Sequence, residues 1–144
     1  MTRLKSDRGT ALLEMALTLP LLLLVSIGIF EFGRAYQYEQ VLTNAAREGA
    51  RVAVLPGQPD TAVQSRVTAY LTAGQIANPS TATITVTQTQ VSIGGATTVP
   101  GSKVTVAYPY SFMVLQPVAR LVVKSSNLGK AFTMTAAAEM RNEQ

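Results

Sequence analysis

The sequence predicts an α+β protein: a single N-terminal transmembrane helix continuing into a long amphipathic helix, a second short helix, and a three- to four-stranded antiparallel sheet. The first sign is an apolar run long enough to cross a bilayer. After it, apolar residues recur twice at helical spacing. Three later segments alternate β-branched and polar residues, as strands do. The chain therefore divides into a basic cytosolic leader at 1–9, a transmembrane helix at 10–30, and an extracytoplasmic α+β domain at 31–144.

The apolar run, TALLEMALTLPLLLLVSIGIF, has 21 residues and one charged side chain, Glu14. As a helix it would span about 30 Å, the thickness of the hydrocarbon core. Because the basic residues precede it, the positive-inside rule places 1–9 in the cytosol. A cleaved secretory signal would have a shorter apolar region ending at small residues, and IGIFEFGR offers no such site. A buried helix of a soluble protein would need a polar face, which the four leucines Leu21–Leu24 do not leave.

Two residues inside this run are unusual for a membrane helix. Pro20 removes one backbone hydrogen bond and is expected to kink the helix, which neighbouring membrane helices tolerate. Glu14 would cost about 2.5–3.5 kcal/mol at the bilayer centre, and less near an interface. Its carboxylate either reaches back to the cytosolic headgroups or pairs with a positive group of another chain.

Composition argues against several function classes. The formal net charge is +4, and three basic and one acidic residue lie in the leader, so the rest of the chain is only weakly basic. Without a basic cluster interleaved with aromatics, no nucleic-acid partner is expected. The chain has no His and no Cys, which removes common metal ligands, acid–base catalysts, thiol nucleophiles and disulfides. We expect no enzyme activity, no metal, no cofactor and no small-molecule substrate.

The helical pattern continues through residues 31–55 to a break at Pro56, Gly57 and Pro59. Its small residues would allow another element to approach closely, either the chain's own sheet, which is favoured, or another subunit. The predicted packing residues are Ala46, Gly49, Ala50 and Ala53. The apolar face is predicted to consist of Phe32, Tyr36, Leu42, Ala46, Gly49 and Ala53.

A second helix is predicted at 61–73, with Asp60 as its N-cap and Gly74 just beyond its C-terminal end. Its apolar face would comprise Val63, Val67, Tyr70 and Leu71.

Strands are predicted at 81–93, 103–112 and 131–140, with a bulge or a bend near 88–90 where the apolar residues change face. Gly94-Gly95 would open a turn that Pro100-Gly101 closes. Pro109 indicates an edge strand or the end of a strand, because it cannot donate a ladder hydrogen bond. Residues 113–130 look irregular, with a short helix near 118–123.

Three blocks, RGTALLEMALTLPLLLL, IFEFGR and LTNAAREGAR, closely resemble the N-terminus of TadE-like (TadE/TadG-type) proteins of the tight-adherence, or Flp type IV, pilus system. The resemblance runs from Arg8 to about Ala53, and AEMRNE at 138–143 resembles the family's C-terminus.

The resemblance implies a pilin-like protein, or pseudopilin, that a prepilin peptidase of the inner membrane cuts after Gly9. The mature chain would begin at Thr10, and Glu14 would be its fifth residue. In related filaments that carboxylate is thought to pair with the freed amino group of a neighbouring subunit. The two groups are about 6 Å apart along one helix axis, so a one-turn stagger between parallel helices would bring them together.

The implied function is that of a minor pilin or pseudopilin assisting assembly of a tight-adherence pilus for surface attachment. Its partners would be the inner membrane, other pilins or pseudopilins, the pilus assembly platform and the prepilin peptidase. It would be a single-pass inner-membrane protein, or lie in the extracellular pilus. The alternatives are a filament-forming pilin subunit, and a membrane-anchored extracytoplasmic binding module outside any filament.

Overall fold

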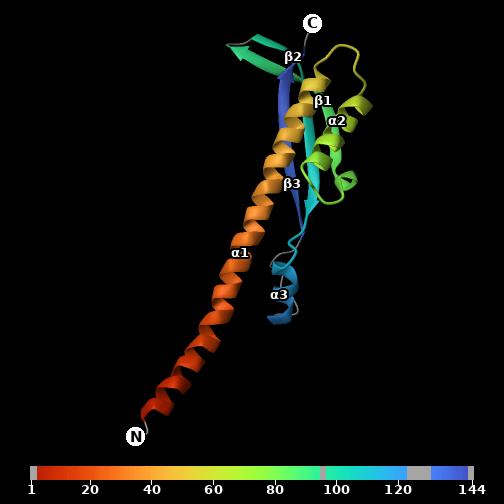
Figure 1. Cartoon of the computed structure of the whole chain (residues 1–144). Helices are drawn as coiled ribbons and strands as arrows, with labels where there is room; N and C mark the ends of the chain where they lie inside the picture. Colours follow the sequence, from red (N-terminus) through yellow and green to blue (C-terminus); the bar gives the residue numbers. More distant parts are fainter. Residues whose placement is uncertain (1–2, 95–96, 123–130, 143–144) are drawn as a thin grey trace. The chain divides into compact units, whose positions relative to one another are not determined.

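The structure, a computed structural model, describes residues 3–94, 97–122 and 131–142. It confirms the α+β class and the three-stranded antiparallel sheet (Figure 1). In chain order the elements are α1 (Arg3–Ala53), α2 (Asp60–Ala73), the 3₁₀ turn η1 (Pro79–Thr81), β1 (Thr83–Gly94), β2 (Thr97–Tyr110), α3 (Leu115–Val122) and β3 (Phe132–Arg141).

These elements form two compact units. Among the described residues, the span unit comprises 3–34 and 112–122, and the head unit comprises 35–94, 97–111 and 131–142. Helix α1 contributes its first part to the span unit and its last part to the head unit.

In the span unit, α1 runs without a break through Pro20. Hydroxyl groups inside the apolar run bond to the preceding turn: Thr18 Oγ1 donates to the Glu14 carbonyl oxygen and Ser26 Oγ to the Leu22 carbonyl oxygen, each at 2.9 Å. Such back-bonding leaves these side chains satisfied without water, which suits a helix in lipid.

The head unit is a two-layer structure in which α1 and α2 cover one face of the sheet β1-β2-β3 (Figure 1). Strand β2 lies in the centre and supplies the sheet's most buried side chains. The opposite face carries exposed threonines of β1 and β3. The buried apolar side chains on these three elements are Ala35, Tyr38, Leu42, Ala45, Ala46 and Ala50 on α1, Val63, Val67 and Leu71 on α2, and Val104, Val106, Tyr108 and Tyr110 on β2.

Two residues of the predicted apolar face of α1 are not part of the core. Phe32 and Tyr36 are 65% and 63% exposed. Tyr36 lies about 120° around the helix from Leu42, because each residue turns the helix by about 100°. The residues actually buried on this turn are Ala35 and Tyr38.

The ends of α2 also differ from expectation. Asp60 is the first helical residue rather than the N-cap, which is Pro59, and no side chain caps this end. Gly74 does end the helix, but its φ is −76° and the left-handed residue is Gln75. A Cβ at Gly74 would lie 2.4 Å from Val41 Cγ1, so this glycine is required by a close approach to α1.

The sheet corrects three predictions about its strands. Pairing of β1 with β2 is continuous across Gln88–Gln90, and the register shifts only between Ser92 and Gly94, so of the predicted bulge or bend at 88–90 the bulge is wrong. Strand β2 begins at Thr97, which places Pro100 and Gly101 inside the strand instead of after a turn. Of the two readings of Pro109, the edge strand is wrong because β2 is central, whereas the end of a strand is confirmed, since β2 ends at Tyr110. The first residue of β1, Thr83, pairs with Ala107, so Pro109 lies beyond the last residue of β2 that β1 pairs with. No ladder hydrogen bond to β1 is therefore lost at this proline.

Candidate functional site

The predicted processing site lies within α1. Gly9 and Thr10 are exposed, and a Cβ added at Gly9 would meet no described atom within 4 Å. Gly9 also has no left-handed backbone conformation that would need a glycine. Because glycine inside a helix costs roughly 0.5–1 kcal/mol relative to alanine, the local fold gives no reason for a glycine here.

Glu14 lies on the exposed surface of the same helix. Every side chain from Gly9 to Ser26 is exposed. Among the residues whose side chains the structure describes, none forms an ion pair with Glu14. Within the described residues, one helix is long and apolar enough to cross a membrane, α1 over Gly9–Ala53, and its most apolar part is not covered by other described residues. This is consistent with single-pass anchoring, and it leaves the carboxylate facing whatever surrounds the helix.

Glu31, the residue after the apolar run, is buried and was not singled out by sequence reasoning. Its Oε1 accepts a hydrogen bond from the Val114 N–H at 2.5 Å, and its Oε2 accepts one from the Met113 N–H at 3.2 Å. Both amides lie just before α3, where backbone N–H groups have no helical acceptor and the helix dipole favours an anion. Beside them, the Phe32 and Phe112 rings meet edge to face with centroids 6.2 Å apart.

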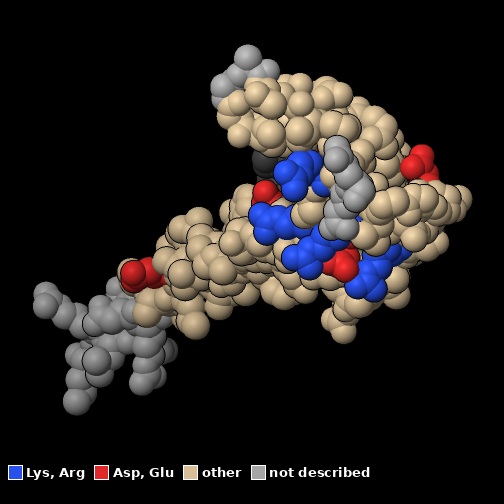
Figure 2. Space-filling model, turned by 90° about the horizontal axis from the view of Figure 1, so that it is seen from above, with Lys and Arg blue, Asp and Glu red and all other residues tan. Residues whose placement is uncertain are grey.

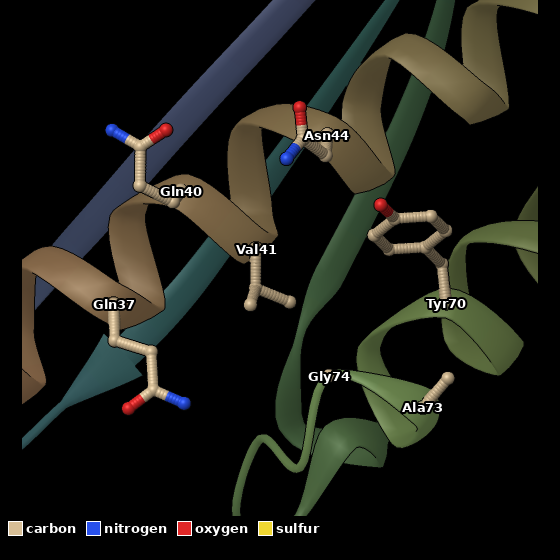
Figure 3. A pocket seen from close by; sticks show the side chains of 7 residues that line it. All are labelled: Gln37, Gln40, Val41, Asn44, Tyr70, Ala73 and Gly74. Carbon is tan, nitrogen blue, oxygen red and sulfur yellow. The ribbon is translucent and has the colours of Figure 1, made fainter.

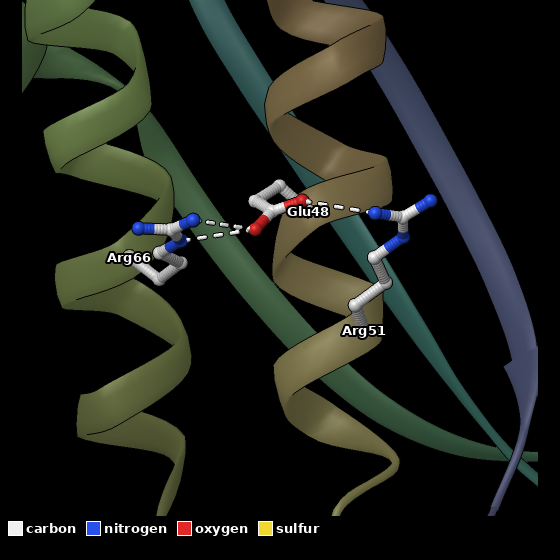
Figure 4. Close-up of polar contacts among 3 residues, drawn as sticks. All are labelled: Glu48, Arg51 and Arg66. Atoms are coloured by element: carbon white, nitrogen blue, oxygen red, sulfur yellow. Dashed lines mark hydrogen bonds and ion pairs between the residues drawn. The ribbon is translucent and has the colours of Figure 1, made fainter.

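In the head unit a carboxylate joins the two helices (Figure 4). Arg66 of α2 donates two hydrogen bonds to Glu48 Oε1 of α1, from Nε at 3.1 Å and from Nη2 at 2.6 Å. Arg51 Nη1 lies 3.7 Å from Glu48 Oε2. The hydrogen bonds from Arg66 hold the pKa of the Glu48 carboxyl below its ordinary value. Burial opposes this lowering of the pKa, and the positive charges of Arg66 and Arg51 add to it.

The small residues predicted for packing contact the chain's own head. Ala46 and Ala50 are completely buried. A Cβ at Gly49 would lie 2.5 Å from Val67 Cγ2 on α2 and 3.1 Å from Val104 Cγ1 on β2. Ala53 is half-buried, and its carbonyl oxygen accepts a hydrogen bond from Ser102 Oγ at 3.3 Å.

An open groove of about 380 Å³ separates α1 from α2 on the outer side of the head (Figure 3). Amide side chains from α1 and an aromatic ring from α2 stand around it, and Val41 points across it toward Gly74. Sequence reasoning did not identify the groove, because its polar residues come from the solvent side of α1. Its lining residues are Gln37, Gln40, Val41, Asn44, Tyr70, Ala73 and Gly74.

Charged side chains on the face that Figure 2 shows are mixed in sign, with acidic residues close to the basic ones. Within the described part of the chain, no three acidic residues are grouped so that they could hold a metal ion.

Part of the chain resembles a known protein family. No curated protein and no solved structure matches the chain. Residues 9–51 match the family model described as TadE-like protein. The match covers the apolar run with Glu14, the EFGR segment that contains Glu31, and the α1 side of the Glu48 ion pair. The resemblance of this N-terminal helix to the TadE-like family is therefore confirmed over residues 9–51.

Proposed function

We propose that this chain is a minor pilin or pseudopilin that assists assembly of a tight-adherence pilus and so serves surface attachment. The observation that carries the proposal is that a TadE-like helix contains Gly9, a glycine that the local fold does not require, and five residues later the exposed carboxylate of Glu14. Gly9 is the residue after which a prepilin peptidase would cut, and Thr10 would begin the mature chain.

Glu14 supports the same proposal through its charge. A lone carboxylate on a lipid-facing helix surface is unfavourable, and a positive partner from another chain removes that cost. The α-amino group of a processed neighbour is such a partner, because it is mostly protonated at neutral pH. We infer that this pair sets the stagger between neighbouring subunits during assembly.

The chain would act as a peptidase substrate and a structural protein, not as an enzyme. Its partners would be the inner membrane, other pilins or pseudopilins, the assembly platform and the prepilin peptidase. The groove between α1 and α2 and the uncovered threonine face of the sheet are exposed on the head. They keep a second candidate open, a membrane-anchored binding module that never enters a filament.

N-terminal sequencing of the protein from native membranes and from sheared surface filaments tests the proposal. The wild-type protein should begin at Thr10, whereas Gly9→Ala should stay at full length. Gly9→Ala makes a clean variant, because the added methyl group meets no described atom and helix propensity improves.

Gly28→Ala is the matched control, because that glycine also has open space in the same helix. It should be processed normally. Wild-type protein that begins at Met1 or Thr2 and occurs only in membranes would contradict the pilin-like route and favour the anchored binding module. Mature protein that is as abundant in the filaments as the subunit of the shaft would favour a filament-forming subunit.

A further inference from the structure

The segment before α3 is hydrogen-bonded to Glu31 of α1, the residue that follows the predicted span. Both Glu31 carboxylate oxygens accept backbone N–H bonds, from Met113 and Val114. The contact joins residues more than eighty positions apart in sequence, and all of them belong to the span unit. An anionic acceptor with two N–H donors, shielded from water, is a strong local restraint.

Around this restraint, apolar side chains point away from the protein. Met113 is 62% exposed, and Phe32 is 65% exposed although its ring edge contacts Phe112. Phe30, the last residue of the predicted span, is 63% exposed. These side chains therefore continue the uncovered apolar surface of the span onto the segment that enters α3.

Helix α3 has the composition of an element that lies at a membrane surface. Leu115 and Val118 are half-buried, while Arg120 in its last turn is exposed. A short amphipathic helix with apolar side chains and a basic residue binds the boundary between headgroups and acyl chains, and anionic lipids strengthen the binding.

We propose that residues 112–120 form a membrane-contact surface, which Glu31 holds against the extracytoplasmic leaflet of the membrane that α1 spans. The occupant is lipid because the surface is continuous with the span through Phe30 and Phe32, and because Glu31 fixes Met113 at the level where the span ends. The inference rests on the anchoring part of the proposed function, and it adds a second, reversible membrane contact.

Depth-dependent quenching in vesicles tests the contact. The chain has no cysteine, so Met113→Cys in the full-length protein gives one labelling site for an environment-sensitive fluorophore. The vesicles contain phosphatidylcholine and phosphatidylglycerol, with or without a nitroxide at the headgroup or high on the acyl chain. Leu24→Cys reports span insertion, and Thr85→Cys on the exposed face of the sheet reports water.

Label at position 113 should lose about half its emission or more with the shallow nitroxide, whereas label at 85 should lose little. Glu31→Ala should bring position 113 close to the value at 85. Glu39→Ala, which changes an exposed glutamate of the same helix, should leave position 113 quenched. Near-UV circular dichroism of the buried tyrosines checks that each variant keeps its head folded.

An unquenched label at 113 beside a quenched label at 24 would overturn the membrane contact while leaving the anchor intact. Blue-shifted but unquenched emission at 113 would overturn it too, since protein would then cover the surface. Quenching at 113 that survives Glu31→Ala would refute the role of the carboxylate. An unquenched label at 24 would instead contradict the anchoring on which the proposed function depends.

Discussion

At the scale of single residues, the packing of the head depends on how closely α1 approaches its neighbours. Gly49 is a point where α1 approaches two elements at once, because a Cβ there would meet Val67 and Val63 of α2 and Val104 of β2. One missing methyl group therefore sets the spacing of helix against helix and of helix against sheet at once.

Gly49→Val should lower the free energy of unfolding by about 1–3 kcal/mol, because the added atoms overpack a site with no free volume. Thermal unfolding of the full chain in detergent, followed by the near-UV signal of the buried tyrosines, measures the loss. Gly33→Val is the matched control, since a Cβ at that helical position meets nothing within 4 Å, and it should cause no loss. Equal stability of the two variants would show that the close approach does not limit packing.

The small residues Ala46, Gly49 and Ala50 are expected from their spacing to lie on one side of α1, and in the structure all three are buried. Sequence reasoning did not predict the role of Glu31. An acidic residue after an apolar run is expected to face water, and the amides that it binds lie in an irregular segment far along the chain. Periodicity describes local structure, whereas this contact depends on how distant segments fold together.

At the scale of elements, α1 and α2 are joined on their solvent side by Glu48 and Arg66 (Figure 4). The Glu48 side chain is 23% exposed and that of Arg66 is 55% exposed, so water and salt screen the pair. Such a pair stabilises a protein by about 0.2–1 kcal/mol.

The contribution of this pair should depend on pH in a defined direction. Because the pKa of Glu48 is lower in the folded chain than in the unfolded chain, the pair stabilises the head fully above the unfolded value. The contribution is lost as the pH falls through the lowered folded pKa. Arg66→Met should therefore be less stable than wild type by about 0.5 kcal/mol at neutral pH, and the difference should shrink in acid.

Unfolding in urea at a series of pH values measures this difference. The double variant Glu48→Gln/Arg66→Met provides the control. Neither it nor Glu48→Gln alone has a titrating carboxyl at position 48, so the difference in stability between these two variants should not change as the pH falls. A difference between Arg66→Met and wild type that stays constant into strong acid would show that the ion pair is not its cause.

The strands show why the buried face of a strand is easier to predict from sequence than the position of that strand in the sheet. The alternation of Val104, Val106 and Tyr108 predicts the buried face of β2, and the structure confirms it. The central position of β2 was not predictable from Pro109, since a proline indicates only that a donor is missing on one side. The partner on that side ends before reaching it, which depends on the length of β1.

At the scale of the whole molecule, the described chain combines a head that buries its own core with a span that buries almost nothing. None of the α1 residues 9–30 is buried, whereas most of the head's buried residues lie on α1, α2 and β2. The family match covers residues 9–51 of α1, so it includes the whole uncovered span as well as the stretch of α1 that packs in the head. The uncovered surface of the span supports the proposal that assembly contacts are made through this part of α1.

Glu14 tests that proposal at the level of assembly. Glu14→Ala should still insert and be processed to Thr10, because the change makes the helix more apolar and leaves Gly9 intact. It should leave the processed amino group of its neighbour unpaired, and breaking one side of a buried ion pair costs about 3–5 kcal/mol, enough to reduce assembly more than tenfold.

Glu14→Gln should fail similarly, since the amide carries no charge, whereas Glu39→Ala on the exposed head surface should assemble as wild type does. Quantifying sheared surface filaments, and the protein recovered with them, against the processed membrane pool separates these outcomes. Normal assembly of a processed Glu14→Ala chain would mean that another contact sets the register between subunits.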